Sequence, residues 1–93
     1  MYNRAVDNVF AVYLKPLYRV QAGAFKIESG AKKFLKQIQA LPDTIGAGYK
    51  NAYIRKVNGL YKVQIGAFSN KSGAEKVKAD LAAKGIVSFI TTE

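Results

Sequence analysis

A cation, a glutamine and a glycine recur at alternate positions in two short stretches of the chain. They are Arg19, Gln21 and Gly23 in YRVQAGAF, residues 18–25, and Lys62, Gln64 and Gly66 in YKVQIGAF, residues 61–68. A glutamine amide has two donors and an acceptor, and the cation adds further donors, so each pair suits a ligand rich in hydroxyl and amide groups. Glycine leaves room for such a ligand to approach the backbone.

The composition leaves little for catalysis. The chain has no Cys and no His, which removes thiolate metal sites, the commonest metal ligand and the usual general base near neutral pH. The six acidic residues form no evident pair, and no glycine-rich loop joins a strand to a helix as in phosphate-binding loops. The sequence therefore predicts a binding module without enzymatic activity, cofactor or metal site.

The net charge narrows the class of partner. Fifteen Lys and Arg against six Asp and Glu give a formal charge of +9 in 93 residues, of which 49% are hydrophobic. This balance suits one small domain that binds a polyanion, such as nucleic acid, an anionic envelope polymer or a membrane surface. No apolar run approaches the roughly 18 residues of a membrane span, and the start MYNRAVDN does not resemble a signal peptide. We therefore expect no membrane insertion.

The two stretches belong to a longer repeat with an offset of 43 residues. Ser29, Gly30, Ala31 and Lys33 recur as Ser72, Gly73, Ala74 and Lys76. After each motif the apolar residues change from alternate to helical spacing, and a second apolar segment follows at residues 51–57 and 86–92. Each unit, about residues 17–57 and 60–92, is therefore predicted to form a strand, a helix and a second strand.

Turn and helix-end signals complete the predicted topology. Asn58-Gly59 favours a tight hairpin between the units, because both residues tolerate positive φ. Pro42 and Gly85 are placed to end the helices, and Ser72 with Glu75 has the pattern of a capping box. The order β-α-β-β-α-β predicts an α+β, ferredoxin-like fold, in which a four-stranded antiparallel sheet carries two helices on one face and a pseudo-twofold relates the units.

Residues 1–16 lie outside the repeat and form a predicted linker or short helix before the domain at residues 17–93. Their apolar residues have roughly helical spacing, and Pro16 follows as a stop. One interpretation is the tail of a preceding domain. The alternative is a helix that packs on the domain or makes it a weak homo-oligomer.

Strand alternation assigns the motif side chains to the two faces of the sheet. The helix side receives Tyr18, Val20, Ala22 and Ala24 of the first copy and Tyr61, Val63, Ile65 and Ala67 of the second. The open side receives the repeated Arg19, Gln21, Gly23, Lys62, Gln64 and Gly66. Since the motif strands are neighbours in this topology, the open-side residues are predicted to line a shallow groove, with Tyr53, Arg55 and Phe89 of the edge strands beside it.

Two alternatives to this groove remain. The open side is a solvated sheet face without a ligand, in which case binding falls to the helix lysines Lys32, Lys33, Lys36, Lys76 and Lys78. A basic sheet of this topology is also the architecture of RNA-recognition motifs, which stack bases on aromatic residues of the central strands. The corresponding positions here are not aromatic and the RNP signature is absent, so a nucleic-acid-binding module is the alternative function.

The doubled pattern aromatic-x-Val-Gln-x-Gly-small-Phe, each time followed by a helix, resembles the SPOR (sporulation-related repeat) domains over residues 17–92. The resemblance implies the fold above and binding of peptidoglycan through the open sheet face, with a preference for glycan strands from which amidases have removed the stem peptides. It implies contact roles for Gln21, Gln64 and Lys62. Leu60 and Ala24 depart from the aromatic and the serine that some members have at these places.

The doubled version is most similar to C-terminal wall-binding domains of N-acetylmuramoyl-L-alanine amidases from spore-forming bacteria and their phages. This similarity implies that the chain targets an attached wall-lytic amidase to its substrate. It also implies a location at the bacterial cell wall, outside the cytoplasm, reached as part of a larger lytic protein or through phage lysis.

Overall fold

The computed structural model describes residues 17–92, so the predicted linker or helix over residues 1–16 lies outside the described part. The elements are β1 (Tyr18–Phe25), α2 (Glu28–Gln39), the 3₁₀ turn η1 (Tyr49–Asn51), β2 (Tyr53–Val57), β3 (Leu60–Phe68), α3 (Lys71–Ala83) and β4 (Phe89–Thr91). None of the helices in this range is both long enough and apolar enough to cross a membrane.

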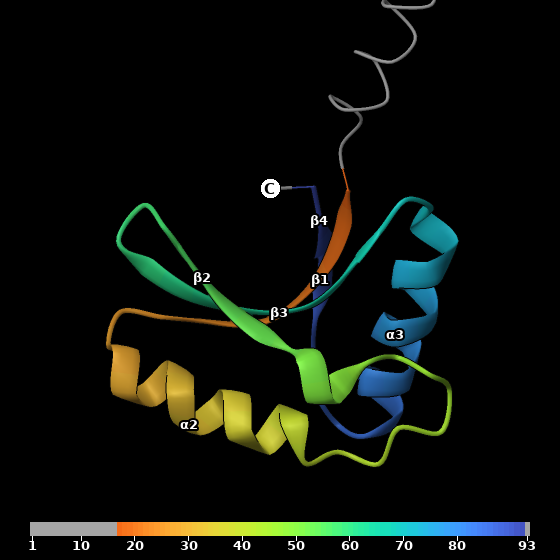
Figure 1. The fold of residues 1–93 in the computed structure, drawn as a ribbon, viewed down its shortest axis with the longest axis horizontal. Helices are drawn as coiled ribbons and strands as arrows, with labels where there is room; N and C mark the ends of the chain where they lie inside the picture. The colour runs from red at the N-terminus through yellow and green to blue at the C-terminus, as the bar shows by residue number, and fades with distance from the viewer. Residues whose placement is uncertain (1–16, 93) are drawn as a thin grey trace, which may run out of the picture.

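The strands form one antiparallel sheet in the order β2-β3-β1-β4, and the predicted α+β, ferredoxin-like fold is confirmed. The motif strands β1 and β3 are neighbours at its centre. Figure 1 shows α2 below the sheet and α3 beside it, while the β2–β3 hairpin curves up away from α2. This hairpin turns at Asn58 and Gly59, which have φ values of 51° and 78° as the sequence predicted.

Three element boundaries differ from those predicted. α3 begins at Lys71 with Asn70 as its N-cap, so Ser72 lies inside the first turn and the capping box does not form. β2 begins only at Tyr53, because the preceding residues form η1. β4 is confined to Phe89–Thr91 within the predicted segment 86–92.

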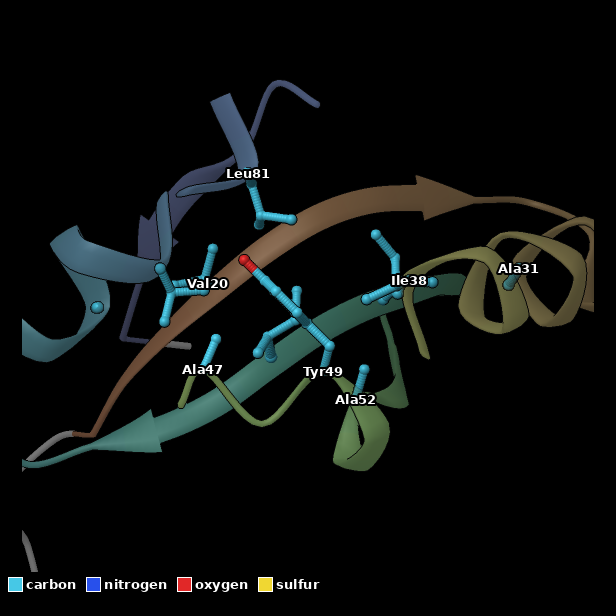
Figure 2. Packing of buried hydrophobic residues seen from close by; sticks show 11 residues of the cluster. Val20, Ala31, Ile38, Ala47, Tyr49, Ala52 and Leu81 are labelled. Atoms are coloured by element: carbon cyan, nitrogen blue, oxygen red, sulfur yellow. The ribbon is translucent and has the colours of Figure 1, made fainter. Parts of the chain in front are cut away.

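The hydrophobic core lies between the sheet and the two helices (Figure 2). Val20, Val63 and Ile65 enter it from the central strands, and Ile38 and Leu81 enter it from α2 and α3; all five are fully buried. Burying one such side chain contributes about 1.5–3 kcal/mol relative to leaving it in water. The apolar half of each motif therefore has the structural role that alternation predicted for it.

Each motif strand contains a β-bulge that shifts the alternation of its second half. On β1, Gln21 pairs with Gln64 but Gly23 pairs with Val63, so β1 has one extra residue between them. On β3, an extra residue lies between the partners of Val20 and Tyr18, next to Gly66 with its φ of 73°. A bulge leaves one residue unpaired and re-aims the side chains beyond it.

In the first copy the bulge reverses the facing of Gly23 and Ala24, so their predicted facing is wrong. Gly23 lies on the helix side, since a Cβ built on it would be 2.9 Å from the Phe25 ring and 3.2 Å from the Phe34 ring of α2. Ala24 is exposed and pairs with Lys62 on the open side instead. The reason is that Phe25, which strict alternation would place in solvent, packs against the core.

The second copy reaches the same result for its phenylalanine by a different local geometry. Phe68 packs against the core, whereas Ala67, predicted to face the helices, is exposed. A Cβ on Gly66 would collide with the Phe68 ring, and its positive φ disfavours any other residue. The glycine of each motif thus makes room for the phenylalanine that follows it two residues later.

A buried tyrosine connects the segment between α2 and β2 to α3. Tyr49 is fully buried, and its hydroxyl donates to Asp80 Oδ2 at 2.5 Å; Figure 2 shows the ring extending across the core. Lys84 Nζ donates to the same oxygen at 2.6 Å. Asp43 closes the preceding loop by accepting from the backbone N–H groups of Ala47 at 2.7 Å and Gly48 at 2.8 Å. The segment between α2 and β2 is therefore fixed by hydrogen bonds of Asp43 near its start and of Tyr49 near its end.

These contacts shift three pKa values. The hydrogen bond from Lys84, and then that from Tyr49, lowers the pKa of Asp80 below its usual value. The backbone hydrogen bonds of Ala47 and Gly48 lower the pKa of Asp43. Burial, and then the hydrogen bond to Asp80, raises the pKa of Tyr49. The folded state therefore stabilises the ionised form of both carboxylates and the neutral form of the tyrosine.

The glycines at the third position of the two helices provide a matched pair of substitutions. A Cβ on Gly30 would lie 3.6 Å from Phe25, an ordinary contact, whereas one on Gly73 would lie 2.9 Å from the ring of Phe68. Because alanine favours helix by about 0.5–1 kcal/mol over glycine, we expect Gly30→Ala to raise the free energy of unfolding by up to about that amount. We expect Gly73→Ala to lower it by about 1–3 kcal/mol through overpacking. Urea denaturation measures both, and equal effects would contradict the difference in packing.

Tyr49→Phe should lower the free energy of unfolding at neutral pH by about 1–3 kcal/mol, because it removes a hydrogen bond to an ionised carboxylate. The folded-state pKa of Asp80 is lowered, so the stability from its ionised form is present above its unfolded pKa of about 3.9 and is lost as the pH falls through the folded value. The difference between wild type and Tyr49→Phe should therefore shrink in acid. A pH-independent difference in urea unfolding would show that the hydroxyl acts otherwise.

Candidate functional site

One row of side chains crosses all four strands on the sheet face opposite the helices. Tyr53 of β2 pairs with Gln64 of β3, Gln64 pairs with Gln21 of β1, and Gln21 pairs with Phe89 of β4. These residues alternate with the buried Val20, Val63 and Ile65, so they lie on the other face. The structure therefore brings together the predicted glutamines and both predicted aromatic neighbours, which form one row that we call the amide row.

The two glutamines are buried, which corrects the expectation of solvent-exposed amides. Gln64 has no exposed surface and Gln21 is 5% exposed. Tyr53 pairs with Gln64, and its hydroxyl donates to the carbonyl oxygen of Gly66 at 2.6 Å, so its side chain lies along β3 beside Gln64. Phe89, which is 53% exposed, is the partner of Gln21. The amides thus form a floor between two aromatic side chains.

The glutamine pair is only partly satisfied by the protein. Gln64 Nε2 donates to Gln21 Oε1 at 3.3 Å, while Gln64 Oε1 is buried and has no hydrogen-bond partner. A buried acceptor without a partner costs about 1–3 kcal/mol. An apolar residue would avoid this cost, so packing alone does not account for glutamine at this position.

Three cations surround the amide row on the same face. Arg55 of β2 pairs with Lys62 of β3 on one side of the row, and Arg19 of β1 pairs with Thr91 of β4 on the other. All three cations are half-buried. The four strands contain no acidic residue, and the acids within residues 17–92 belong to α2, α3 and the loop after α2. The predicted Arg19, Arg55 and Lys62 therefore give this face a positive charge.

The predicted glycines have other surroundings. Gly23 lies toward the helices, so it does not belong to the floor of the face. Gly66 lies next to the amide row, where its carbonyl oxygen accepts from Tyr53. Each has a structural reason to be glycine in its contact with a phenylalanine. Close approach of a ligand to these two backbones is therefore not required to explain them.

A hollow of about 790 Å³ lies between β4 and α3, and sequence reasoning did not find it. It is lined by Tyr18, Lys71, Glu75, Lys78, Phe89, Ile90, Thr91 and Thr92. Phe89 belongs both to this hollow and to the amide row, so the two surfaces adjoin. No sequence pattern indicated the hollow, because it depends on how α3 packs beside a very short strand. Within residues 17–92, no group of three or more metal-ligating side chains comes together.

The comparisons with known proteins identify the class of this domain. The chain belongs to the SPOR domain family, whose model matches residues 14–92. A search of curated proteins found no match.

Among solved structures, the chain is similar to the solution structure of the peptidoglycan-binding domain of CwlC, a cell wall lytic enzyme of B. subtilis. The two share 33% sequence identity with a TM-score of 0.65, and the match covers 82% of this chain and 87% of the other.

The burial of the glutamines predicts what substitutions will do to stability. Gln64→Ala and Gln21→Ala should each lower the free energy of unfolding by about 1–3 kcal/mol, since each opens a cavity and removes a hydrogen-bond partner. The double variant Gln21→Met/Gln64→Met should stay within about 1 kcal/mol of wild type, because it fills the space and removes both buried amides. Thermal and urea denaturation test this. Alanine variants as stable as wild type would mean that the amides are solvated after all.

Proposed function

We propose that the chain binds bacterial peptidoglycan through the sheet face that carries the amide row. The observation that carries the proposal is the 33% identity, over 82% of the chain, to the peptidoglycan-binding domain of CwlC. The match of the SPOR family model to residues 14–92 supports the same class of ligand.

The chemistry of the face suits a glycan. Tyr53 and Phe89 offer aromatic surfaces on which the apolar faces of sugar rings stack. The buried Gln64 Oε1 has an unused acceptor capacity that a sugar hydroxyl or acetamido N–H would satisfy after displacing part of the aromatic cover. An open sheet face encloses little of its ligand, so we expect affinity for a short fragment on the order of micromolar.

The finer parts of the proposal concern the form of the glycan and the purpose of binding. We propose that strands depleted of stem peptides are the preferred form. The domain itself does no chemistry and holds an attached wall-lytic enzyme, an N-acetylmuramoyl-L-alanine amidase, at the cell wall. Tethering raises the local concentration of the catalytic domain without any new contact to its substrate.

A pull-down with purified sacculi tests the proposal. The chain should be retained by sacculi at physiological salt, and sacculi pretreated with an amidase should retain several-fold more. Gln21→Met/Gln64→Met should fold but bind several-fold more weakly, because each lost neutral hydrogen bond is worth about 0.5–1.5 kcal/mol. Gln37→Met, a change of the same chemistry on an exposed position of α2, is the matched control and should bind as wild type does.

Two further measurements separate this function from others. An RNA oligonucleotide in the same assay should be retained less than sacculi; retention by RNA without retention by sacculi would favour the basic nucleic-acid-binding module instead. A wall suspension treated with the chain alone should keep its turbidity. A loss of turbidity would contradict a purely binding role.

A further inference from the structure

We propose that Arg19, Arg55 and Lys62 recognise the carboxylates that amidase cleavage leaves on the glycan strand, an inference that rests on the proposed function. Through these cations the domain would bind strands according to the negative charge that cleavage leaves on them. The preference for strands without stem peptides would then come from an attraction to what cleavage creates, in addition to any relief from steric hindrance.

The placement of charge on the molecule motivates the proposal. The sheet face holds Arg19, Arg55 and Lys62, and the strands that the structure describes contain no acidic residue. The acidic residues of the helices are engaged by nearby lysines: Lys32 contacts Glu28 at 3.4 Å, Lys71 contacts Glu75 at 4.0 Å, and Lys84 contacts Asp80 at 2.6 Å. The strands of the face contribute no carboxylate that would repel an anionic ligand or compete with it.

The chemistry of amidase cleavage supplies a matching anion. Water attacks the carbonyl carbon of the amide between the lactyl group of muramic acid and the first residue of the stem peptide. The C–N bond breaks, the peptide leaves as an amine, and the lactyl group keeps a carboxylate that is ionised at neutral pH. In an uncleaved strand the same carbonyl is a neutral amide. A stripped strand is therefore a polyanion with a carboxylate on each muramic acid.

The positions of the cations fit a ligand that crosses the amide row. Lys62 lies two residues from Gln64 along β3, and Arg19 lies two residues from Gln21 along β1 in the opposite direction. At about 3.3 Å per residue, these two cations are roughly 13 Å apart along the strands, with the amide row between them. Arg55 stands beside Lys62, so one end of the face holds two cations and the other holds one.

A purely steric origin of the preference for stripped strands would have stem peptides keep a strand from approaching Gly23 and Gly66. The structure gives this origin less support, because Gly23 lies on the helix side. Partly buried cations interact with a carboxylate more strongly than fully exposed ones, because the surroundings screen them less. An arginine can also bind a carboxylate through two parallel hydrogen bonds.

The test compares amidase-stripped glycan strands with the same strands after carbodiimide coupling to ammonia, which converts each carboxylate to a neutral carboxamide of nearly the same size. Wild type should bind the carboxamide strands about tenfold more weakly by titration calorimetry. Arg55→Gln and Lys62→Gln should each weaken binding to the carboxylate strands about three- to fivefold and weaken binding to the carboxamide strands by clearly less than that.

Lys56→Gln is the matched control. It is the same charge change on the neighbouring residue of β2, but Lys56 pairs with Tyr61 and lies over its ring at 5.3 Å, on the helix side of the sheet. It should bind both kinds of strand as wild type does. Melting temperatures of all variants exclude loss of fold as the cause of weaker binding.

The outcomes distinguish this inference from the function on which it rests. If wild type binds carboxylate and carboxamide strands equally well, the carboxylate inference is wrong while glycan binding stands. If wild type binds neither, the proposed function itself fails. If poly(glycerol phosphate) displaces the stripped strands as efficiently as free strands do, the face recognises anionic polymers in general and the inference is again wrong.

Discussion

The contact between each motif phenylalanine and the glycines around it is the constraint on which the rest of this structure depends. Phe25 and Phe68 must enter the core, although strict alternation would place them in water. A bulge on each motif strand resolves this conflict, and glycine is present where a Cβ would otherwise meet the ring. Because the bulges fix the pairing of β1 with β3, they also fix Gln21 opposite Gln64. The register that brings the two glutamines together is thus linked to a packing requirement on the other face.

The sequence predicted the topology well because the signals for it are local. The internal repeat, the change from alternate to helical spacing and the Asn58-Gly59 turn each depend on neighbouring residues. Alternation also predicted the facing of four polar residues correctly, because each precedes the bulge of its own strand. They are Arg19, Gln21, Lys62 and Gln64. The predicted facing of Gly23, Ala24 and Ala67 was wrong, because a bulge depends on how two strands pair and not on the alternation within one strand. The one available signal was a large phenylalanine at an outward position.

Burial was harder to predict than facing. Nothing in the motif indicates that Gln64 is inaccessible, since its neighbour Tyr53 belongs to β2, which lies outside the motif and pairs with β3 through the Asn58-Gly59 hairpin. The result is a face in two levels, with amides beneath and cations and aromatic rings above. Under the proposed function, the amides would select for hydrogen-bonding geometry, while the cations would act at longer range. On the helices, Lys32 and Lys71 form exposed ion pairs, which contribute little to stability.

The two outer strands of the sheet have a consequence if, as the proposed function implies, many copies of the domain bind one polymer. An unpaired strand edge is a template on which another copy can add its own strand. Here β4 has only three residues, and β2 carries the adjacent cations Arg55 and Lys56 along its edge. A short edge offers few backbone hydrogen-bonding groups, and a positively charged edge repels the same edge of a second copy. Under the proposed function, neighbouring copies on one polymer would therefore bind side by side without joining their sheets edge to edge.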